Sequence, residues 1–486
     1  MVRDLLIGGK NTPAANGRTT TDVTPYTGEV FATVAAAEPE DVTAAVDAAQ
    51  ARFESWAELD PYARRKIFVA AADEMERRGD EAVALIAAET GGLSGSARFN
   101  VARAADIFRE LAASITAPLG EVLTSHEPNT LSMSMRAPMG VVAALAPWNA
   151  PLILGVRAAA APLAAGNTVV LKPSEEAPIM SGLFIADVLR DAGLPDGVLN
   201  VVTNDPADAS AIVETLISDE RVRAVNFTGS SGVGRIIASL AGKHLKPAVL
   251  ELGGKNSIIV LEDGDIDYAV AATAFAAYSN AGQVCMSCDR ILVHESRAQE
   301  FTEKFLAKVS TLATGTPQDP DAKVGPMINA AAAQRVSRLV ADAVAAGAKL
   351  LSGGGRPEGA IHPVTLFTDV PKEAQLFYAE TFGPVCSIDT FSSDDEAVAK
   401  ANDTEYGLTA GVITENSTRG LQVALRLQTG IVHINDQTLG DEPQVPFGGF
   451  KASGVGRFGG RWSSEAFSNT RWVTIATRHA NAKFRI

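Results

Sequence analysis

A cysteine past the middle of the chain stands where a nucleophile could act. Cys285 ends the run 280–285, Asn-Ala-Gly-Gln-Val-Cys, a glycine-containing turn that follows a predicted helix. A cysteine attacks as its thiolate, and a nearby helix N-terminus or cation would lower its pKa. An arbitrary cysteine is more often a small buried hydrophobe. Cys285 is therefore a candidate nucleophile only in combination with other groups.

Two further side chains suit the chemistry of a carbonyl group. Glu251 follows an apolar strand and precedes a Gly-Gly pair, where a general base could be placed, although a solvated glutamate in a turn has the same pattern. Asn149 stands between two prolines, so its amide loses little entropy on ordering and could point at a developing oxyanion. The alternative is a turn that caps the next helix.

Two other segments have the composition of a nucleotide site. In the run Lys-Pro-Ser-Glu at 172–175, Lys172 and Glu175 could bind ribose hydroxyls, and the carboxylate would repel a 2′-phosphate. The run 227–234, Phe-Thr-Gly-Ser-Ser-Gly-Val-Gly, predicts a strand, a turn and a helix start, which suits a pyrophosphate. It does not match G-x-G-x-x-G, and a lone Gly/Ser turn is more often structural.

These groups need a scaffold that brings distant segments together. From Gly140 onward, short β-branched runs alternate with helical segments, which predicts parallel sheets covered on both faces that bind ligands at the strand carboxyl ends. The predicted strands of a first domain are 140–146, 168–171, 198–202, 222–227 and 248–250, and those of a second are 257–261, 290–294, 385–391, 410–414 and 431–435. The predicted helices are 152–164, 179–192, 206–217, 232–240, 266–280, 297–312, 330–346, 394–401 and 418–427, after a helical region at 39–113. Two strand-like runs, 129–136 and 470–477, have no obvious partner in either sheet.

Composition excludes several kinds of partner. The 486 residues are 46% apolar and carry a net charge of −15, which opposes binding to nucleic acid or to an anionic membrane. The apolar stretch 137–166 contains four prolines, Asn149 and Arg157, so a membrane-spanning helix is not expected there. Three cysteines and an N-terminus without a secretory apolar run predict a cytoplasmic address. The six histidines are scattered, and no metal site is predicted.

Taken together and in this order, the segments resemble the aldehyde dehydrogenase superfamily. The likeness extends from Pro-Tyr-Thr-Gly-Glu at 25–29 to Pro-Phe-Gly-Gly at 446–449 and Ser-Gly at 453–454. By resemblance, Cys285 matches the nucleophile, Glu251 the general base and Asn149 the oxyanion donor. The implied reaction is the NAD-dependent oxidation of an aldehyde to an acid through a thiohemiacetal and a thioester on Cys285.

The resemblance also implies a cofactor site for NAD. The implied contacts are Trp148, Lys172, Ser174, Glu175, Gly229, Ser230, Val233, Leu252, Glu380 and Phe382. In the family, the positions of Lys172 and Glu175 bind the adenosine ribose, and those of Glu380 and Phe382 the nicotinamide ribose. NADP stays open, since a flexible Glu175 could swing aside. The run 203–206, Thr-Asn-Asp-Pro, departs from the glycines that many members carry there, which leaves the adenine side open.

The implied fold class is α/β with a Rossmann-like cofactor domain, an α/β catalytic domain and a small bridging β-sheet for oligomerisation. The corresponding divisions are 1–122 with 140–252 for the cofactor domain, 253–452 for the catalytic domain, and 123–139 with 453–486 for the bridging segments. The two strand-like runs would then extend sheets across a subunit interface. A homodimer or a dimer of dimers is implied.

Within the family, the runs 282–287, 441–449 and 456–460 look most like the vanillin, benzaldehyde and salicylaldehyde dehydrogenases. A small-molecule aromatic aldehyde is the implied substrate, with Phe447 as a stacking wall and Met286 and Arg157 beside it. Arg157 stands where many relatives have a bulky aromatic, so it either donates to a substituent on the ring or belongs to a local ion pair.

Several alternatives stay open. The substrate could be an aliphatic aldehyde or a semialdehyde, or coenzyme A could replace water as the group that resolves the thioester. A binding protein that keeps the fold without turnover is a further alternative. Cys288 is expected to be a packing residue, with a redox partnership with Cys285 as the other interpretation.

Overall fold

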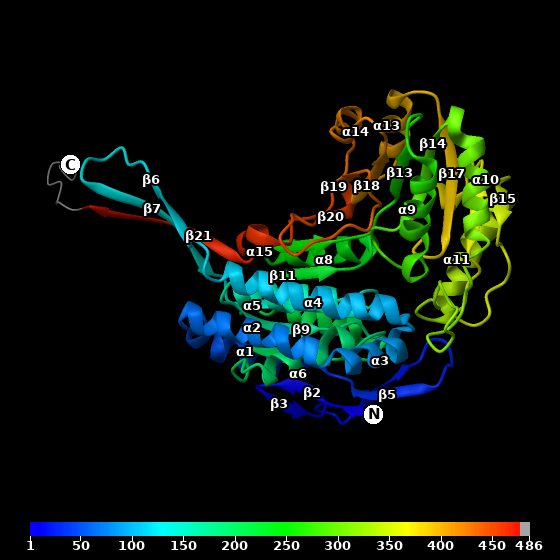
Figure 1. Cartoon of the computed structure of the whole chain (residues 1–486). Coiled ribbons are helices and arrows are strands. Elements are labelled where there is room, and N and C mark those ends of the chain that lie inside the picture. Colours follow the sequence, from blue (N-terminus) through cyan, green and yellow to red (C-terminus); the bar gives the residue numbers. More distant parts are fainter. Residues whose placement is uncertain (477–486) are drawn as a thin grey trace.

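Two large sheets and a projecting three-stranded arm make up the computed structural model, which describes residues 1–476 (Figure 1). The first sheet runs in the order β20 (Gly454–Val455), β12 (Ala248–Glu251), β11 (Val222–Thr228), β8 (Val141–Leu145), β9 (Thr168–Lys172), β10 (Leu199–Val201), β2 (Leu5–Ile7) and β3 (Lys10–Thr12). Its five central strands are parallel, whereas β20, β2 and β3 pair antiparallel at the edges. The predicted α/β fold class is confirmed.

The first sheet is buried on both faces, as its apolar strands require. In β8, Val141, Ala143 and Leu145 face one layer of helices, whereas Val142 and Ala144 face the other, because successive side chains in a strand point to opposite faces. The helices on the first face are α1 (Pro39–Ala57), α7 (Ala209–Ser218) and α8 (Ser231–Lys243). Those on the second are α2 (Pro61–Arg77), α3 (Gly79–Thr90), α4 (Ser94–Ser114), α5 (Pro151–Ala164) and α6 (Phe184–Asp191). Every residue of α5 is buried, which explains its almost wholly apolar sequence.

The second sheet lies beside the first. Its order is β15 (Lys349–Ser352), β16 (Thr365–Thr368), β17 (Val385–Phe391), β14 (Cys288–His294), β13 (Asn256–Val260), β18 (Thr409–Ile413) and β19 (Ile431–Ile434). Helices α9 (Ile266–Tyr278) and α10 (Ala298–Val309) pack on one face, α13 (Asp394–Asn402) and α14 (Ser417–Ala424) on the other, and α11 (Ala330–Ala345) with α12 (Gln375–Tyr378) near the β16 end. The short strands β15 and β16 were not among the predicted strands.

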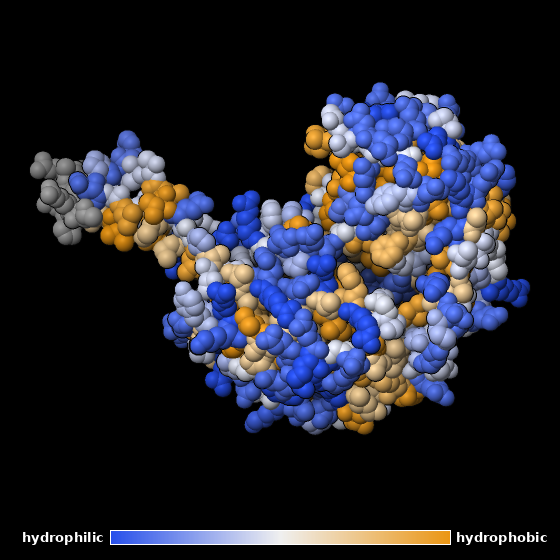
Figure 2. Space-filling view, viewed as in Figure 1, coloured by the Kyte–Doolittle hydropathy of each residue, from blue (hydrophilic) through white to orange (hydrophobic). Residues whose placement is uncertain are grey.

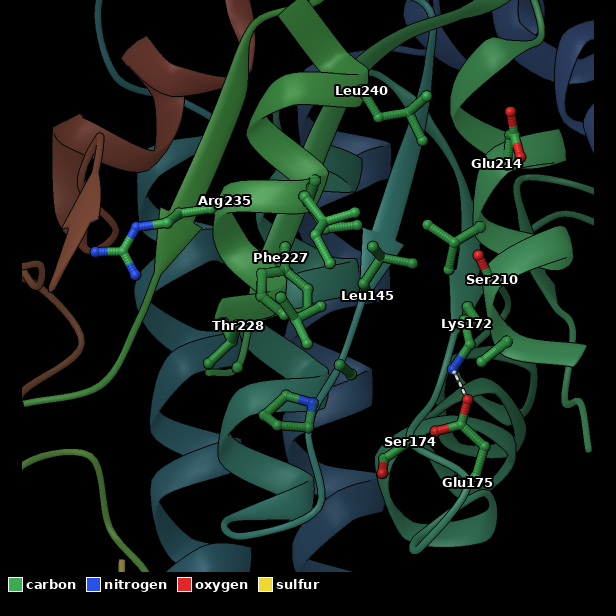
Figure 3. A pocket seen from close by; sticks show the side chains of 18 of the residues that line it. Leu145, Lys172, Ser174, Glu175, Ser210, Glu214, Phe227, Thr228, Arg235 and Leu240 are labelled. Atoms are coloured by element: carbon green, nitrogen blue, oxygen red, sulfur yellow. Dashed lines mark ion pairs between the residues drawn. The ribbon is translucent and has the colours of Figure 1, made fainter. Parts of the chain in front are cut away.

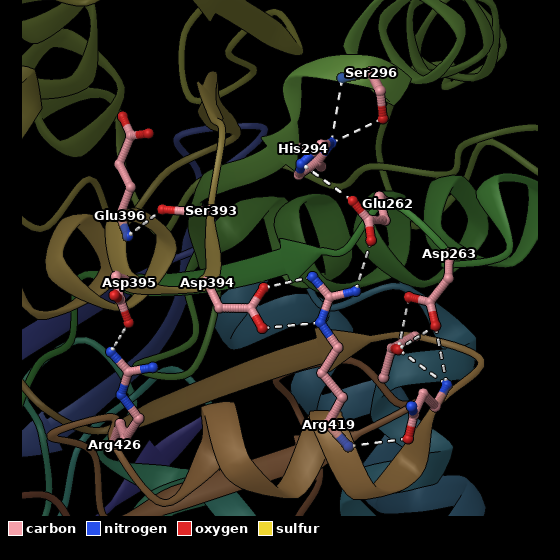
Figure 4. A network of polar contacts seen from close by, with 12 residues as sticks. Glu262, Asp263, His294, Ser296, Ser393, Asp394, Asp395, Glu396, Arg419 and Arg426 are labelled. Carbon is pink, nitrogen blue, oxygen red and sulfur yellow. Dashed lines mark hydrogen bonds and ion pairs between the residues drawn. The ribbon is translucent and has the colours of Figure 1, made fainter.

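Ion pairs fasten the outer helices of this sheet to the end of β13 (Figure 4). Arg419 at the start of α14 pairs with Asp394 of α13 at 2.7 Å and with Glu262 at 3.0 Å. Asp263 accepts the Thr414 hydroxyl at 2.7 Å. The chain segments after β13 and β18 are therefore held together by side chains from four parts of the sequence.

Two of the predicted helices do not begin with an α-helical turn in the structure. The 206–217 helix begins with a 3₁₀ turn, Pro206–Asp208, before α7, and the 179–192 helix begins with a π-helical turn, Ile179–Leu183, before α6. At the second of these starts, the buried Glu89 carboxylate accepts the backbone N–H groups of Ile179 and Met180 at 2.7 and 2.8 Å. A carboxylate from a distant helix thus caps donors that a sequence pattern does not show.

The N-terminal region also contributes a small separate sheet. Strands β1 (Val2–Arg3), β5 (Val30–Ala35) and β4 (Thr19–Val23) form it in this order. Within residues 1–476, no helix is both long and apolar enough to cross a membrane.

In the arm, the two strand-like runs that had no predicted partner pair with each other. β21 (Ser468–Ala476) pairs antiparallel with β7 (Thr130–Pro138) along its whole length, and β6 (Gly120–Leu123) pairs with the other edge of β7. The last predicted residue, Thr477, lies outside the described residues, as does the rest of the bridging segment to 486. The arm therefore begins at Gly120, and β20 lies in the first sheet although 453–486 was assigned to the bridging segments.

A single buried side chain joins the root of the arm to the first sheet. Asn167 is fully buried, and its Oδ1 accepts the N–H groups of Met139 and Gly140 at 2.6 and 3.1 Å. Its Nδ2 donates to the carbonyls of Pro162 and Phe467 at 3.1 and 2.8 Å. The start of β8, the end of α5 and the start of β21 thus depend on one amide.

We expect Asn167→Ala to lower the free energy of unfolding by at least about 2 kcal/mol, because it leaves buried backbone donors and acceptors unpaired. Thermal unfolding followed by circular dichroism would show this as a clear fall in Tm. Asn11→Ala, at an exposed position of edge strand β3, is the matched control and should change stability by less than about 0.5 kcal/mol. Equal Tm values for the two variants would contradict the role assigned to Asn167.

Candidate active site

The turn before Cys285 is held in a shape that only its glycine permits. Asn280 and Ala281 have left-handed backbone angles, with φ of 51° and 55°, and Gly282 follows with φ of 69°. A Cβ on Gly282 would lie 2.1 Å from the carbonyl oxygen of Gly383. Any side chain there would collide with backbone. The segment that carries Cys285 is therefore pressed against the segment before β17.

Glu251 is brought to the same place by the Gly-Gly pair that follows it. Glu251 is the last residue of β12, and a Cβ on Gly254 would lie 2.8 Å from the carbonyl oxygen of Cys285. Asn256 then donates its amide to the carbonyls of Cys285 and Ser287, at 2.9 Å each. The end of a strand of the first sheet thus touches the loop that leads into β14 of the second.

Asn149 is tied to this loop by two hydrogen bonds. Its Nδ2 donates to the carbonyl of Gln283 at 3.0 Å, and the Asn280 amide donates to the carbonyl of Asn149, also at 3.0 Å. Gln283 in turn accepts the Ile328 N–H at 2.8 Å, which anchors the loop from its far side. The structure therefore brings together the three predicted catalytic residues, which come from three distant parts of the chain.

Burial controls the protonation of the two titratable members. It raises the pKa of the Cys285 thiol to about 12, and the nearby charges of Glu251 and Glu380 add to the rise. Burial also raises the pKa of Glu251 well above its ordinary value, against the opposing effect of Arg157 and Arg457. Without a ligand the thiol is held protonated, and the raised pKa makes the Glu251 carboxylate a stronger base than a carboxylate at the surface.

A cavity of about 930 Å³ opens at the carboxyl ends of β8, β9 and β11 (Figure 3). Six of the predicted cofactor contacts line it: Trp148, Lys172, Ser174, Glu175, Gly229 and Val233. A seventh, Ser230, caps α8 beside it, with its hydroxyl accepting the N–H of Val233 at 3.3 Å. The cavity thus combines the strand ends of a parallel sheet with a helix N-terminus, as a dinucleotide site does.

Glu175 is held in place on the cavity wall and is ionised. Its Oε1 lies 2.6 Å from Lys172 Nζ (Figure 3). The same oxygen accepts the Asn204 amide at 2.9 Å. Burial alone would raise the pKa of Glu175, but the charge of Lys172 and these hydrogen bonds lower it below its ordinary value. The carboxylate is therefore available to accept ribose hydroxyls. Asn204, in the run that departs from the family pattern, is one of its partners.

The three remaining predicted cofactor contacts, Glu380, Phe382 and Leu252, do not line this cavity. The Gly254 N–H donates to Glu380 Oε1 at 3.2 Å, and the Phe382 ring meets Trp148 edge-to-face with centroids 5.6 Å apart. Leu252 packs against Gly234, where a Cβ would lie 2.5 Å from its side chain. Since Trp148 also lines the cavity, its contact with Phe382 connects the cavity wall to one of these three residues.

The three predicted substrate residues lie in, or in contact with, the large apolar core that Cys285 packs against. Phe447 and Met286 are buried in the same apolar core that Cys285 packs against. Arg157 forms an ion pair with Asp441 at 2.7 Å and lies 4.6 Å from the centre of the Phe447 ring. Of the two interpretations of Arg157, the structure shows the local ion pair.

Several residues that support the site were not predicted from the sequence. Asp441 lies in the run 441–449 and had no predicted role of its own, although a buried arginine such as Arg157 requires an acidic partner. Asn256, which holds the Cys285 carbonyl, gave no signal beyond its place two residues after the Gly-Gly pair. Cys288 faces a different core from Cys285, and its Sγ donates to the Arg290 carbonyl at 3.3 Å, as expected of a packing residue.

The chain is similar in sequence and in structure to several known proteins. The chain is 50% identical over 471 residues to the vanillin dehydrogenase of Pseudomonas sp. strain HR199, with 97% of both chains covered. It is 38% identical to the benzaldehyde dehydrogenase (NAD+) of Pseudomonas putida, with 97% of this chain and 96% of that one covered. The crystal structure of a salicylaldehyde dehydrogenase from Pseudomonas putida G7, complexed with salicylaldehyde, matches with a TM-score of 0.96 at 38% identity and 98% coverage of each chain. The profile of the aldehyde dehydrogenase family matches residues 12–473. The chain therefore belongs to the aldehyde dehydrogenase family.

Proposed function

We propose that this enzyme oxidises aromatic aldehydes of the benzaldehyde and vanillin type to carboxylic acids with NAD+. The observation that carries the proposal is the convergence of Cys285, Glu251 and Asn149 around one loop, with hydrogen bonds joining that loop to the other two segments. The names of the vanillin, benzaldehyde and salicylaldehyde dehydrogenases that the chain resembles support the aromatic substrate.

In the first step the sulfur of Cys285 adds to the aldehyde carbonyl. Glu251 takes the thiol proton, because it ends the strand that the Gly-Gly pair brings against the Cys285 loop and its raised pKa makes its carboxylate a stronger base. The new oxyanion is held by the Asn149 amide and by the backbone N–H of Cys285. Loss of one such donor typically costs about 2.7–4 kcal/mol of barrier.

A bound nicotinamide supplies the hydride acceptor that turns the thiohemiacetal on Cys285 into a thioester. After Glu251 has released the first proton to solvent, it removes a proton from water, and the resulting hydroxide attacks the thioester carbonyl. The bond to sulfur then breaks, the sulfur of Cys285 takes this proton back from Glu251, and the acid and the free thiol are released. A buried carboxylate in this place favours water over coenzyme A as the attacking group, since a general base for water is already present.

NAD+ is the preferred cofactor in this proposal because of Glu175. Its carboxylate is ionised and fixed by Lys172 and Asn204, so it accepts the ribose hydroxyls and repels a 2′-phosphate. The cavity walls, the capped N-terminus of α8 and the contacts near Cys285 together would hold the cofactor.

Phe447 and Met286 form the apolar side of the substrate pocket, which suits a flat ring better than a short alkyl chain. Arg157 and Asp441 add a charged pair next to it. Aliphatic aldehydes and semialdehydes remain the alternative substrates, and they would use the same three catalytic residues.

We also propose a homodimer, or a dimer of dimers, built through the arm. The strand register places six apolar residues on one face of the arm: Val122, Leu131, Met133, Met135, Val473 and Ile475. Figure 2 shows apolar side chains gathered on the arm, and Val122 is 75% exposed. A second copy of the chain would cover this face and pair with the half-buried edge strand β19.

The three-part domain division belongs to this proposal. A cytoplasmic address also belongs to it, and it suits the free thiols of Cys285, Cys288 and Cys386.

We expect a panel of aldehydes, measured as kcat/KM with NAD+ and with NADP+, to favour ring aldehydes and NAD+. The panel contains benzaldehyde, vanillin, salicylaldehyde, hexanal and succinic semialdehyde, each with and without coenzyme A. NADH absorbance gives the rate, and chromatography identifies the product. A preference for hexanal or the semialdehyde would overturn the aromatic assignment, and an acyl-coenzyme A product would overturn hydrolysis.

We expect Glu251→Gln to give one burst of NADH per active site and then almost no turnover, because the amide cannot activate water. Rapid mixing with benzaldehyde would measure the burst, and mass spectrometry would detect the acyl group on Cys285. Cys285→Ala is the paired variant and should give neither burst nor turnover. Sustained turnover in Glu251→Gln would remove Glu251 from its role in hydrolysis.

We expect Val122→Asp to shift the protein toward the monomer, because a charge on the apolar face of the arm would have to be buried in the subunit interface. Light scattering after size-exclusion chromatography gives the mass. Val2→Asp, at a position on β1 that is 74% exposed, is the control and should keep the wild-type mass. An unchanged mass for Val122→Asp would contradict the proposed interface.

A further inference from the structure

A buried pair of opposite charges stands beside the reacting groups and takes no part in the steps above. Arg157 comes from α5, and Asp441 comes from the loop between β19 and β20. Their side chains are only 6% and 10% exposed, and they meet through Arg157 Nη2 and Asp441 Oδ2 at 2.7 Å. The other ends, Nη1 and Oδ1, are buried and have no hydrogen-bond partner among the described residues. Arg157 and Asp441 therefore each keep one buried polar atom that could still form a hydrogen bond.

The pair lies close to Glu251. The Arg157 guanidinium sits 4.6 Å from the centre of the Phe447 ring, and a Cβ on the next residue, Gly448, would lie 2.6 Å from Glu251 Oε1. Both carboxylate oxygens of Glu251 are likewise buried and without a partner in the described part of the chain. The side chains of Glu251, Arg157 and Asp441 are all largely buried, so their charges interact more strongly than they would at the surface.

The two charges act in opposite directions on both catalytic groups. Arg157 lowers the pKa of Glu251 and of Cys285, whereas Asp441 raises the pKa of both. Two other charged groups face them: Arg457 acts on Glu251, and Glu380 acts on Cys285. Arg157 and Asp441 are named among the charges that act on both members of the catalytic pair.

We propose that Arg157 and Asp441 are positioning residues that set the balance between the protonated and ionised forms of Cys285 and Glu251. Arg157 favours the thiolate and the carboxylate. Asp441 moderates this effect and holds the guanidinium against the Phe447 ring. This inference rests on the roles proposed above for Cys285 and Glu251.

Asp441 has a second consequence for Glu251. An unrestrained arginine next to a buried carboxylate would form a bidentate salt bridge, which would occupy the oxygens that must take a proton from water. Because Asp441 holds Nη2, the arginine stabilises Glu251 at a distance and leaves both of its carboxylate oxygens free.

The test is the rate at which iodoacetamide alkylates Cys285 between pH 7 and 9, in the enzyme without substrate. Over this range the thiol is mostly protonated, so the rate is proportional to the thiolate fraction, and a pKa shift of one unit changes it about tenfold. Cys285→Ala gives the background from the two buried thiols. Arg461→Gln, at an exposed arginine of α15 (Gly460–Ala466), is the matched control.

We expect Arg157→Gln to slow alkylation about tenfold and Asp441→Asn to accelerate it about tenfold, as opposite charges a few ångströms away do. The double variant should return close to the wild-type rate, since the two effects cancel. Arg157→Lys keeps the charge and should stay close to wild type, as should Arg461→Gln. The double variant leaves no unpaired buried charge, so it also guards against misfolding of the single variants.

Shifts in the same direction, or a double variant as slow as Arg157→Gln, would overturn the inference. So would unchanged rates in both single variants, which are expected if Arg157 only contacts substituents on the substrate. Because alkylation uses neither aldehyde nor nicotinamide, this test can fail while the aldehyde panel succeeds, and the reverse also holds.

Discussion

The whole site depends on the close approach of two backbone segments, at places where no side chain fits. Gly254 brings the end of β12 against the carbonyl of Cys285, and Gly282 brings the turn before Cys285 against the carbonyl of Gly383. The first contact lies where the chain passes from the first sheet to the second, and the other lies between two loops that lead into strands of the second sheet. Glu251 ends a strand of the first sheet and Cys285 lies in the loop before β14, and the glycines remove the side-chain atoms that would keep these segments apart.

Much of this architecture could be predicted from the sequence, because its elements have strong local patterns. The central strands of both sheets are continuous apolar runs, as fully buried strands are, and their predicted limits lie within a few residues of the observed ones. The fold class and the family are confirmed. The individual roles of Cys285, Glu251 and Asn149 and of the cofactor contacts remain predictions, although the structure brings these residues together.

What escaped prediction depends on contacts between distant residues. Arg157 and Asp441 are 284 positions apart, and no local pattern shows that one neutralises the other. The π-helical turn at Ile179 depends on Glu89, which lies 90 positions earlier. Strands β15 and β16 are four residues long and border the edge of their sheet, where a short apolar run is hard to distinguish from a loop. In each case tertiary packing, rather than local propensity, decides the structure.

The protonated state of Cys285 has a consequence for the survival of the enzyme. Oxidants such as peroxide attack the thiolate far faster than the thiol, and they convert it to sulfenic and then to irreversibly oxidised acids. A pKa of about 12 keeps nearly all of the resting enzyme in the unreactive form. The burial that raises the pKa of Cys285 and makes activation of the sulfur necessary therefore also disfavours its oxidation while no ligand is bound.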